Sequence, residues 1–465
     1  MSKLDLFIGA LKEDIIDESL LEDVLVSENV GEFLNVCLGL ERNIANNYCI
    51  GRFYFQKRSY RNALRFFLWC ANQGHHEAMF YIGLTFYCRV PSNKKKALEW
   101  FVSSARYGNT KSYIWIGYMY YSQNDIDNAL EWYLKSSNLG NSDAMVKIGH
   151  IYYHVFKDVP NALIWLSNSA LLGNSDAMLN IGGIYYDGKL MVRNEEKAIT
   201  WYTQSANFGN CSAMFHLGLI HHTGSELVRD ELKALEWYVR AANLGFHDAL
   251  FNIGYLYHKG ENKDEKAAVE WYTESAKHGN REAMFNLGMI YYTFVGQQNE
   301  KLALEWLIRC ANCGNKNSLC MVGYIYHNAF GDHKNAIEWY KKSASLGDRV
   351  AMFNLGQIYD NGEYMDRKVA FEYYMESAKR GYPDALFKLG FIAHTDSNDE
   401  KAALEWYIGA ANLGHKDAMF NVACIYHHGE VSDMKLAIEW YTKCAKLGDD
   451  EANYQLGLLF RVSFQ

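Results

Sequence analysis

The chain has 465 residues, of which 49% are hydrophobic, and a formal net charge of −8. No apolar run reaches the ~18 residues that a membrane-spanning helix needs, so we expect no membrane insertion. The charge is negative and forms no basic stripe, which argues against a nucleic-acid partner. A globular chain of this length would divide into about three domains, yet no linker or low-complexity tract interrupts the sequence.

The first 44 residues carry most of the net charge. Eight acidic residues against two lysines in the first thirty positions give −6 of the total −8. The apolar residues Leu4, Ile8, Leu11 and Ile15 have helical spacing and form one stripe. We therefore predict N-terminal acidic capping helices over residues 1–44, with the polar outer face that a repeat array needs at its end. The alternative is an acidic helix that docks a partner.

From residue 45 onward, one pattern recurs every 32 to 36 residues. A small residue marks the first helix of each unit, helix A, and we number this residue position 0. Alanine usually stands at position −5 and an aromatic residue at position +3. The position 0 residues are Gly51, Gly83, Gly117, Gly149, Gly182, Gly218, Gly254, Gly288, Gly323, Gly356, Gly390, Ala423 and Gly457. Positions −4, −1, 0 and +3 share one helical face, which we expect to be buried.

A second helix of each unit, helix B, is marked by tryptophan. Ten of the twelve tryptophans in the chain occupy this position, with Phe66 and Tyr373 in two other units. Alanine lies three residues before it, alanine or serine five after it, and glycine eight after it. Large rings that alternate with small residues predict interdigitated packing, with the tryptophan in the core. The glycine suits the left-handed backbone of a helix C-cap.

These spacings predict twelve A–B helix hairpins over residues 45–448 and a lone C-terminal capping helix in residues 449–465. Nine residues separate the B-terminal glycine from position 0 of the next helix A in all twelve cases. The distance from position 0 to the helix B aromatic varies between 15 and 19 residues. We therefore expect a fixed B-to-A turn and a free A-to-B loop.

The compartment is predicted from the cysteines and the N-terminus. The ten cysteines follow no repeat position that we recognise, and acidic residues interrupt the apolar stretches at the N-terminus. Neither feature fits a secreted, disulfide-stapled protein. We expect a cytoplasmic or cytosol-like location without a signal peptide, or the host cytoplasm if the source is a virus.

The repeat resembles a known family. Residues 359–374 and 377–390 are similar to the Sel-one-like repeat, a relative of the tetratricopeptide repeat, and the resemblance extends over roughly residues 45–460. The Gly-x-Gly that the family has after helix A is mostly reduced here to a single glycine. The resemblance implies an all-α fold, an α/α right-handed superhelical solenoid of about twelve hairpins with terminal half-repeat caps. It also implies an adaptor or scaffold that holds other proteins together.

Polar residues at positions −2 and +1 of helix A are the candidate peptide-binding set. Both positions lie on one face, away from the glycine stripe. In the tetratricopeptide fold that the resemblance implies, helix A lines a concave groove, and an amide there can donate to and accept from an extended peptide at once. The structural alternative is an asparagine that bonds a neighbouring helix or simply faces water. The candidates are Asn180, Asn252, Asn286, Asn354, Asn421, Tyr255, Tyr324 and Gln357.

Three other patterns favour structure over chemistry. Histidines recur at position +4, but equivalent positions in neighbouring repeats are ~8–10 Å or more apart, too far to share one zinc ion. Cys310 and Cys313 form a lone C-x-x-C, which ordinary packing explains. Glutamate before the helix B aromatic is followed four residues later by lysine or arginine in five repeats, as in surface ion pairs. We expect no catalytic residue, metal or cofactor.

Three functions follow from these observations. The first is a scaffold or adaptor that binds protein or peptide segments in the groove of the array. The second is an enzyme of the hydrolase class built on the array, which would need a pocket of converging ionisable groups. The third is a purely architectural protein that self-associates through its convex or terminal surfaces. The sequence favours the first and does not name the partner.

Overall fold

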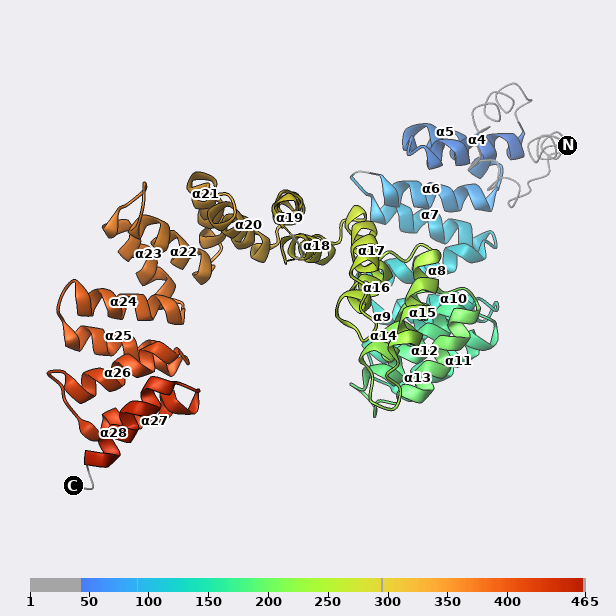
Figure 1. The fold of residues 1–465 in the computed structure, drawn as a ribbon. Helices are drawn as coiled ribbons and strands as arrows, with labels where there is room; N and C mark the ends of the chain where they lie inside the picture. The colour runs from blue at the N-terminus through green and yellow to red at the C-terminus, as the bar shows by residue number, and fades with distance from the viewer. Residues whose placement is uncertain (1–42, 90, 294–295, 463–465) are drawn as a thin grey trace. The chain divides into compact units, whose positions relative to one another are not determined.

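The computed structural model describes residues 43–89, 91–293 and 296–462, which fold into 25 helices, α4–α28, without strands (Figure 1). The acidic capping helices predicted for residues 1–44 lie outside the described residues. Of this range only residues 43 and 44 are described, and they begin the first hairpin. The remaining helices alternate between A and B. This confirms the all-α solenoid of helix hairpins.

The chain divides into two compact units, Met1–Leu244 and Gly245–Gln465. In the first unit the A helices are α4 (Ile44–Gln56), α6 (His76–Cys88), α8 (Thr110–Tyr121), α10 (Ser142–His154), α12 (Ser175–Asp187) and α14 (Cys211–Thr223). Its B helices are α5 (Tyr60–Asn72), α7 (Lys94–Arg106), α9 (Ile126–Ser137), α11 (Val159–Leu171), α13 (Glu195–Asn207) and α15 (Glu231–Asn243).

The second unit repeats the arrangement and ends on a lone helix. Its A helices are α16 (Asp248–Lys259), α18 (Arg281–Thr293), α20 (Lys316–Asn328), α22 (Arg349–Asp360), α24 (Pro383–Thr395), α26 (Lys416–His428) and α28 (Asp450–Val462). Its B helices are α17 (Glu265–Lys277), α19 (Gly296–Asn312), α21 (His333–Ser345), α23 (Arg367–Lys379), α25 (Glu400–Asn412) and α27 (Met434–Lys446).

The B-to-A turn is fixed by its cap residues. All twelve B-terminal glycines have φ between 71° and 91°, which confirms the predicted left-handed C-cap. In six of the twelve turns the next residue is an asparagine that caps helix A. For example, Asn174 Oδ1 accepts from the backbone N–H of Ala177 at 3.0 Å. Its Nδ2 donates to Asp143 of the preceding repeat at 2.8 Å, so the same side chain joins two repeats.

The A-to-B loop is less free than its variable length predicts. The backbone N–H at the N-cap of helix B donates to the carbonyl of the position +3 residue across both short and long loops. Asp125 makes this bond to Tyr120 at 3.0 Å, and Asn194 makes it to Tyr185 at 2.8 Å across a longer connection. The start of helix B is therefore held at one place on helix A, and extra residues are accommodated between these two points.

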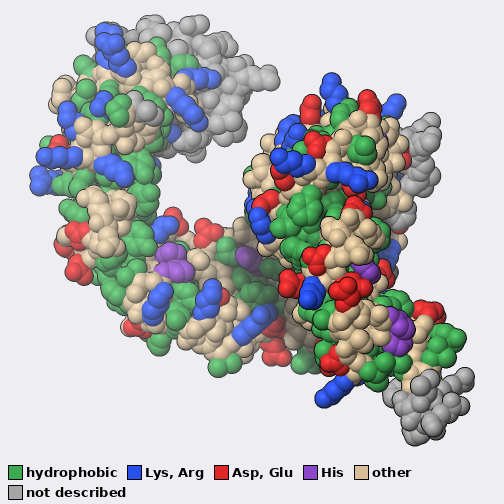
Figure 2. Space-filling view, turned by 90° about the vertical axis from the view of Figure 1, so that its left-hand side faces the viewer, with side chains coloured by type: hydrophobic (Ala, Val, Ile, Leu, Met, Phe, Trp, Pro, Cys, Tyr) green, Lys and Arg blue, Asp and Glu red, His purple; other side chains and the backbone are tan. Residues whose placement is uncertain are grey.

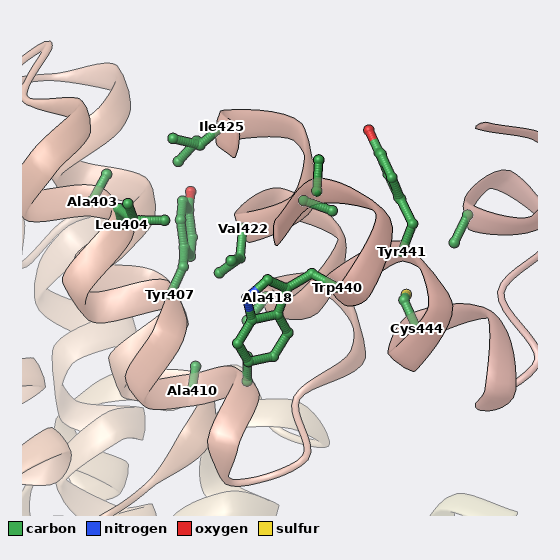
Figure 3. Close-up of a cluster of buried hydrophobic side chains, with 14 residues drawn as sticks. Ala403, Leu404, Tyr407, Ala410, Ala418, Val422, Ile425, Trp440, Tyr441 and Cys444 are labelled. Atoms are coloured by element: carbon green, nitrogen blue, oxygen red, sulfur yellow. The ribbon is translucent and has the colours of Figure 1, made fainter. Parts of the chain in front are cut away.

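The large core residue of each hairpin is the one that follows the tryptophan position, a ring in ten hairpins and Leu166 or Leu307 in the other two. The predicted packing register was therefore wrong by one position. A Cβ at Gly254 would stand 2.7 Å from the ring of Tyr272, which is fully buried, whereas Trp271 is half-buried. The buried positions of helix B are spaced as i, i+4, i+7 and i+8, and the tryptophan stands beside this stripe. Figure 3 shows the arrangement in α25–α27, where Tyr407 points toward Val422 and Trp440 reaches back over Ala418.

In seven hairpins a buried hydroxyl or thiol of helix B donates to the carbonyl of the first residue of helix A. Ser205 Oγ donates to the carbonyl of Ser175, the first residue of the paired helix A, at 2.7 Å. Cys310 Sγ makes the equivalent contact to the carbonyl of Arg281 at 3.1 Å. Cys70 and Cys444 occupy the same place in their own hairpins. These three cysteines therefore do follow a repeat position, contrary to the interpretation of the sequence.

Candidate binding surface

The predicted asparagines lie on one face of the A helices, and all five are half-buried. Tyr255 and Tyr324 are more open, with 39% of each exposed, and Gln357 is exposed. We call this surface, formed by positions −2, +1 and +5 of successive A helices, the A-face. Figure 2 shows one side of the molecule, on which basic and acidic side chains are interspersed with hydrophobic ones.

The asparagines differ in their contacts within the fold. Asn180 and Asn252 donate to carbonyls one turn earlier on their own helices, at 2.8 and 3.2 Å. Burial raises the pKa of Tyr272, and Asn286, which approaches its hydroxyl, partly opposes this rise, although the contact lacks hydrogen-bond geometry. Asn354 and Asn421 likewise approach Tyr340 and Tyr407, each of which belongs to the preceding hairpin. These contacts give each asparagine a structural role beside any binding role.

Three hollows open between successive A helices, and each contains one of the predicted residues. The largest, which we call the Gly183 hollow, has a volume of about 370 Å³ and contains Asn180. A second, of about 300 Å³, contains Gln357 together with His327 and His333. A third, of about 230 Å³, contains Asn421 and Cys424. The hollows therefore coincide with the face on which the sequence placed the candidate residues.

The Gly183 hollow lies between α10, α12 and α14, with α11 and α13 beneath it. Its floor includes Leu166 and Tyr202, which are almost fully buried. Its other lining residues are Gly149, His150, Tyr153, His154, Leu179, Asn180, Gly183, Ile184, Tyr186, Asp187 and His216. Rings from three successive A helices thus surround one cavity.

The rings of the Gly183 hollow are held by contacts with one another. His150 and His154 lie one turn apart on α10 with ring centroids 4.1 Å apart. His216 of α14 stacks on Tyr202, with centroids 5.2 Å apart and an interplanar angle of 11°. Tyr153 donates its hydroxyl hydrogen to Asp187 at 3.2 Å. The walls are therefore positioned by the fold before any ligand arrives.

The electrostatics of the Gly183 hollow favour neutral imidazoles. Partial burial is the main cause that lowers the pKa of His150, His154 and His216. Nearby lysines lower it further for the two histidines of α10. The hydrogen bond from Lys189, 2.9 Å away, is the main cause that holds the pKa of Asp187 below its ordinary value. At neutral pH the charged side chain among the lining residues is Asp187, and it is already paired with Lys189.

The histidines at position +4 pack edge-on against the core tyrosines. His258 meets Tyr272 with ring centroids 6.0 Å apart at 90°, and His427 meets Tyr441 in the same way. Among the described residues, no three His, Cys, Asp or Glu side chains come together as a metal site requires. Likewise, none of the described helices combines the length and apolar character needed to cross a membrane.

Two other sequence patterns have structural counterparts. Cys310 is buried and donates its thiol hydrogen to the carbonyl of Arg281. Cys313 is exposed, and the two cysteines do not form a disulfide. Four of the five predicted ion pairs on helix B are present, including Glu305–Arg309 at 2.7 Å and Glu439–Lys443 at 2.8 Å. The cation of each also lies over the ring of the adjacent tryptophan, as Lys443 does over Trp440 at 4.1 Å.

Sequence reasoning missed Gly183 as a determinant of the surface. It stands at position +1, where twelve other A helices carry a side chain, and it is the one glycine in that row. Comparison of position +1 across all repeats would have found it. Because Gly182 beside it already marks position 0, Gly183 was not recognised as a separate feature.

Comparison with known proteins gives matches along most of the chain. The Sel1 repeat profile matches residues 76–109, 142–174, 175–210, 211–246, 247–280, 281–315, 317–348, 349–382, 383–415 and 416–449. A tetratricopeptide repeat profile matches residues 110–141. No curated protein matches the chain.

Two solved structures share the fold. One is c5321, a protective antigen present in uropathogenic Escherichia coli strains that displays an SLR fold. It is 26% identical with a TM-score of 0.56, and the match covers 86% of this chain and 90% of that one. The other is a Sel1 repeat protein from Oxalobacter formigenes, 24% identical with a TM-score of 0.51, covering 62% of this chain and 87% of that one.

Proposed function

The chain belongs to the Sel1 repeat family, and on that premise we propose that it is an adaptor that binds a segment of another protein along its A-face. This repeat fold commonly serves as a protein-interaction scaffold and is typically non-enzymatic. The groove, the peptide-binding residues and the adaptor role are our proposal.

The observation that carries the proposal is the coincidence of hollows and polar side chains. The three hollows lie at different repeats, yet each contains a position −2 or +1 amide: Asn180, Gln357 or Asn421. An extended segment needs such a series, because its side chains require cavities and its backbone requires groups that donate and accept. In the second unit the A helices α20 and α22 approach one another, and the hollow that contains Gln357 has lining residues from both of them.

The test is capture of partners with and without these amides. We would purify the full chain from a lysate of the cells that produce it, beside the triple variant Asn180→Ala, Gln357→Ala and Asn421→Ala. Quantitative mass spectrometry should find a small set of proteins that the variant loses by at least tenfold. Retention of every partner by a variant that keeps its helicity and melting temperature would remove the A-face from the proposal.

A matched control changes the same number of exposed residues on the B helices. Glu236, Glu305 and Glu439 lie in surface ion pairs away from the hollows. Replacing all three with glutamine should leave the captured set unchanged. If the two triple variants lose the same proteins, the effect would come from general surface charge or stability rather than from the A-face.

Self-association is a second candidate, favoured by a different surface. The residue before the B-terminal glycine is apolar and exposed in successive repeats of the first unit, with Leu139, Leu172 and Phe208 between 57% and 62% exposed. Sedimentation of the full chain across a hundredfold range of concentration would test this candidate. A concentration-dependent oligomer that Leu139→Gln and Leu172→Gln abolish would support it, and a monomer throughout would end it.

The hydrolase alternative has one observation on its side. His154, Tyr153 and Asp187 converge on the Gly183 hollow, which gives a carboxylate near an imidazole. A screen of amide and ester substrates with the wild-type chain and Asp187→Asn would test it. Turnover that the substitution removes would establish a hydrolase activity. Equal background rates in both proteins would contradict the hydrolase alternative.

A further inference from the structure

The Gly183 hollow exists because one side chain is missing from a regular row. Position +1 of helix A carries Tyr118 and His150 in the two preceding repeats and Leu219 in the following one. At Gly183, a Cβ would have a single neighbour within 4 Å, the hydroxyl oxygen of Tyr202 at 3.7 Å. The space that a large side chain fills elsewhere is therefore open here, above a buried ring.

The backbone does not need this glycine. Gly183 lies within α12 and has an ordinary helical conformation, unlike the B-terminal glycines with positive φ. Glycine in a helix interior is unfavourable compared with alanine. Position 0, one residue earlier, needs glycine because Tyr202 lies 2.6 Å from where its Cβ would stand, but the same argument does not apply to position 183. What the second glycine provides is the open volume.

The walls of this volume are flat rings with hydrogen-bonding groups between them. His150 and His154 form one side, and His216 lies stacked on Tyr202 at the other. The Tyr202 hydroxyl on the floor and the Asn180 carboxamide on the wall are polar. Rings pack well against rings, in offset or edge-to-face arrangements. The cavity volume of about 370 Å³ is enough for one aromatic side chain with its backbone.

The charges around the hollow match a neutral occupant. A cation would need an available carboxylate, but Asp187 is already bound by Lys189 and Tyr153. Lys147, Lys157 and Lys189 act on the two histidines of α10 and add further positive potential. An anion would meet the Asp187 carboxylate at the rim. Burial keeps the imidazoles neutral, so they can both donate to and accept from a polar group on the ligand.

We propose that the Gly183 hollow is a specificity pocket for a neutral aromatic side chain that bears a hydrogen-bonding group, a phenol or an indole, on a bound protein segment. The proposal rests on the proposed function for the source of that side chain. The pocket sets which residue of the segment is recognised, while the amides along the A-face bind its backbone. The hollow itself can be tested without any partner.

The experiment uses p-cresol, the side-chain analogue of tyrosine, with the full chain. Ligand-observed saturation-transfer NMR should detect binding to the wild type with a Kd in the millimolar range, as befits so small a molecule. Gly183→Leu introduces the residue that the next repeat has at this position and should weaken p-cresol at least tenfold. Gly183→Ala adds only the Cβ and should weaken it less. n-Butylguanidinium, the analogue of arginine, should bind no more tightly to the wild type than to Gly183→Leu.

A matched control makes the same leucine substitution at position +1 of another repeat. Phe391→Leu changes an exposed position +1 residue of α24 that lines none of the three hollows, and this variant should bind p-cresol as the wild type does. Circular dichroism and the melting temperature check that Gly183→Leu remains folded. Equal p-cresol binding by the wild type and Gly183→Leu, or none by either, would overturn the pocket. Tighter binding of n-butylguanidinium than of p-cresol at this position would overturn its assignment to a neutral ring.

The outcome is separable from that of the proposed function. If p-cresol behaves as expected but the amide variant still captures every partner, the pocket stands and the groove proposal fails. If the amide variant loses partners while p-cresol does not bind, the groove proposal stands and the ring pocket is wrong.

Discussion

Gly254 stands directly against the ring of Tyr272, and a Cβ at position 254 would lie 2.7 Å from Tyr272 Cδ1. The relationship recurs with Tyr238 beneath Gly218 and Tyr374 beneath Gly356. In these hairpins the glycine of helix A lets the flat ring of helix B approach the helix A backbone closely. This pair of residues sets the spacing of each hairpin, and so the spacing of the A helices that form the proposed binding face.

The first prediction is that Gly254→Ala destabilises the second unit. Overpacking a core typically costs about 1–3 kcal/mol, and the gain in helix propensity returns about 1 kcal/mol. The difference is a net loss of up to about 2 kcal/mol, and we expect the upper part of this range because Tyr272 is fully buried. Hydrogen exchange of amides in α16 and α17 is the appropriate measurement, since repeat arrays open locally.

Gly183→Ala is the matched control for this prediction. It changes a glycine one position later in the equivalent helix of the first unit, where the nearest atom would be 3.7 Å from the new Cβ. Its expected effect is between zero and a stabilisation of about 1 kcal/mol, from helix propensity alone. Equal effects of the two substitutions would show that the ring does not determine the need for glycine at position 254.

The second prediction ranks the two aromatic residues of helix B. Tyr272→Ala should cost about 3–5 kcal/mol, as large-to-small substitutions of buried aromatic residues do. Trp271→Ala should cost less, because Trp271 is half-buried and leaves its space partly to solvent. Urea unfolding followed by circular dichroism compares the two midpoints. A larger shift for Trp271→Ala would restore the packing register that the sequence predicted.

The sequence was sufficient for the helices and their order. The regular recurrence of Gly254 and its equivalents, the tryptophans and the B-terminal glycines predicted hairpins over residues 45–448, and the family assignment confirms that fold. The core ring was missed for a physical reason. Trp271 and Tyr272 are consecutive, and consecutive side chains point about 100° apart around a helix. An error of one position therefore selects the wrong buried face. The rarer and larger residue was taken as the core.

The candidate site was only partly predictable. The position −2 asparagines share a face, which periodicity shows, but periodicity does not reveal that Asn286 also approaches the hydroxyl of Tyr272. Nor does it reveal a cavity, which depends on what neighbouring helices lack. Gly183 is visible in the sequence as the second of two glycines, yet its meaning depends on His150 and His216 standing on either side of it.

The third prediction concerns Cys310, which the structure places in a serine position. Cys310→Ser should leave stability within about 0.5 kcal/mol, because serine at this position in other hairpins makes the same bond to the helix A carbonyl. Cys310→Val should cost about 1 kcal/mol or more, because it leaves the carbonyl of Arg281 without this donor. Thermal melting of both variants measures this. A large loss for the serine variant alone would instead indicate chemistry specific to the thiol.

The fourth prediction is a pH dependence from the histidines that pack against the core tyrosines. Burial is the main cause that lowers the pKa of His258, with Lys259 and Lys263 adding to it. In the unfolded chain the same imidazole titrates near its ordinary value of about 6.5. As pH falls below that value, the unfolded state binds a proton before the folded state does. The stability that neutral His258 contributes is therefore complete above about pH 6.5 and declines as the pH falls toward the lower folded pKa.

Two measurements check this window. The Hε1 chemical shift of His258 followed by NMR should give a titration midpoint below 6.5 in the folded chain. The melting temperature of His258→Gln, which cannot titrate, should fall less than that of the wild type between pH 7 and pH 5. If the melting temperature of His258→Gln falls with pH as steeply as that of the wild type, the pH dependence comes from other groups. Protonation of His258 beside Tyr272 would then not be linked to stability.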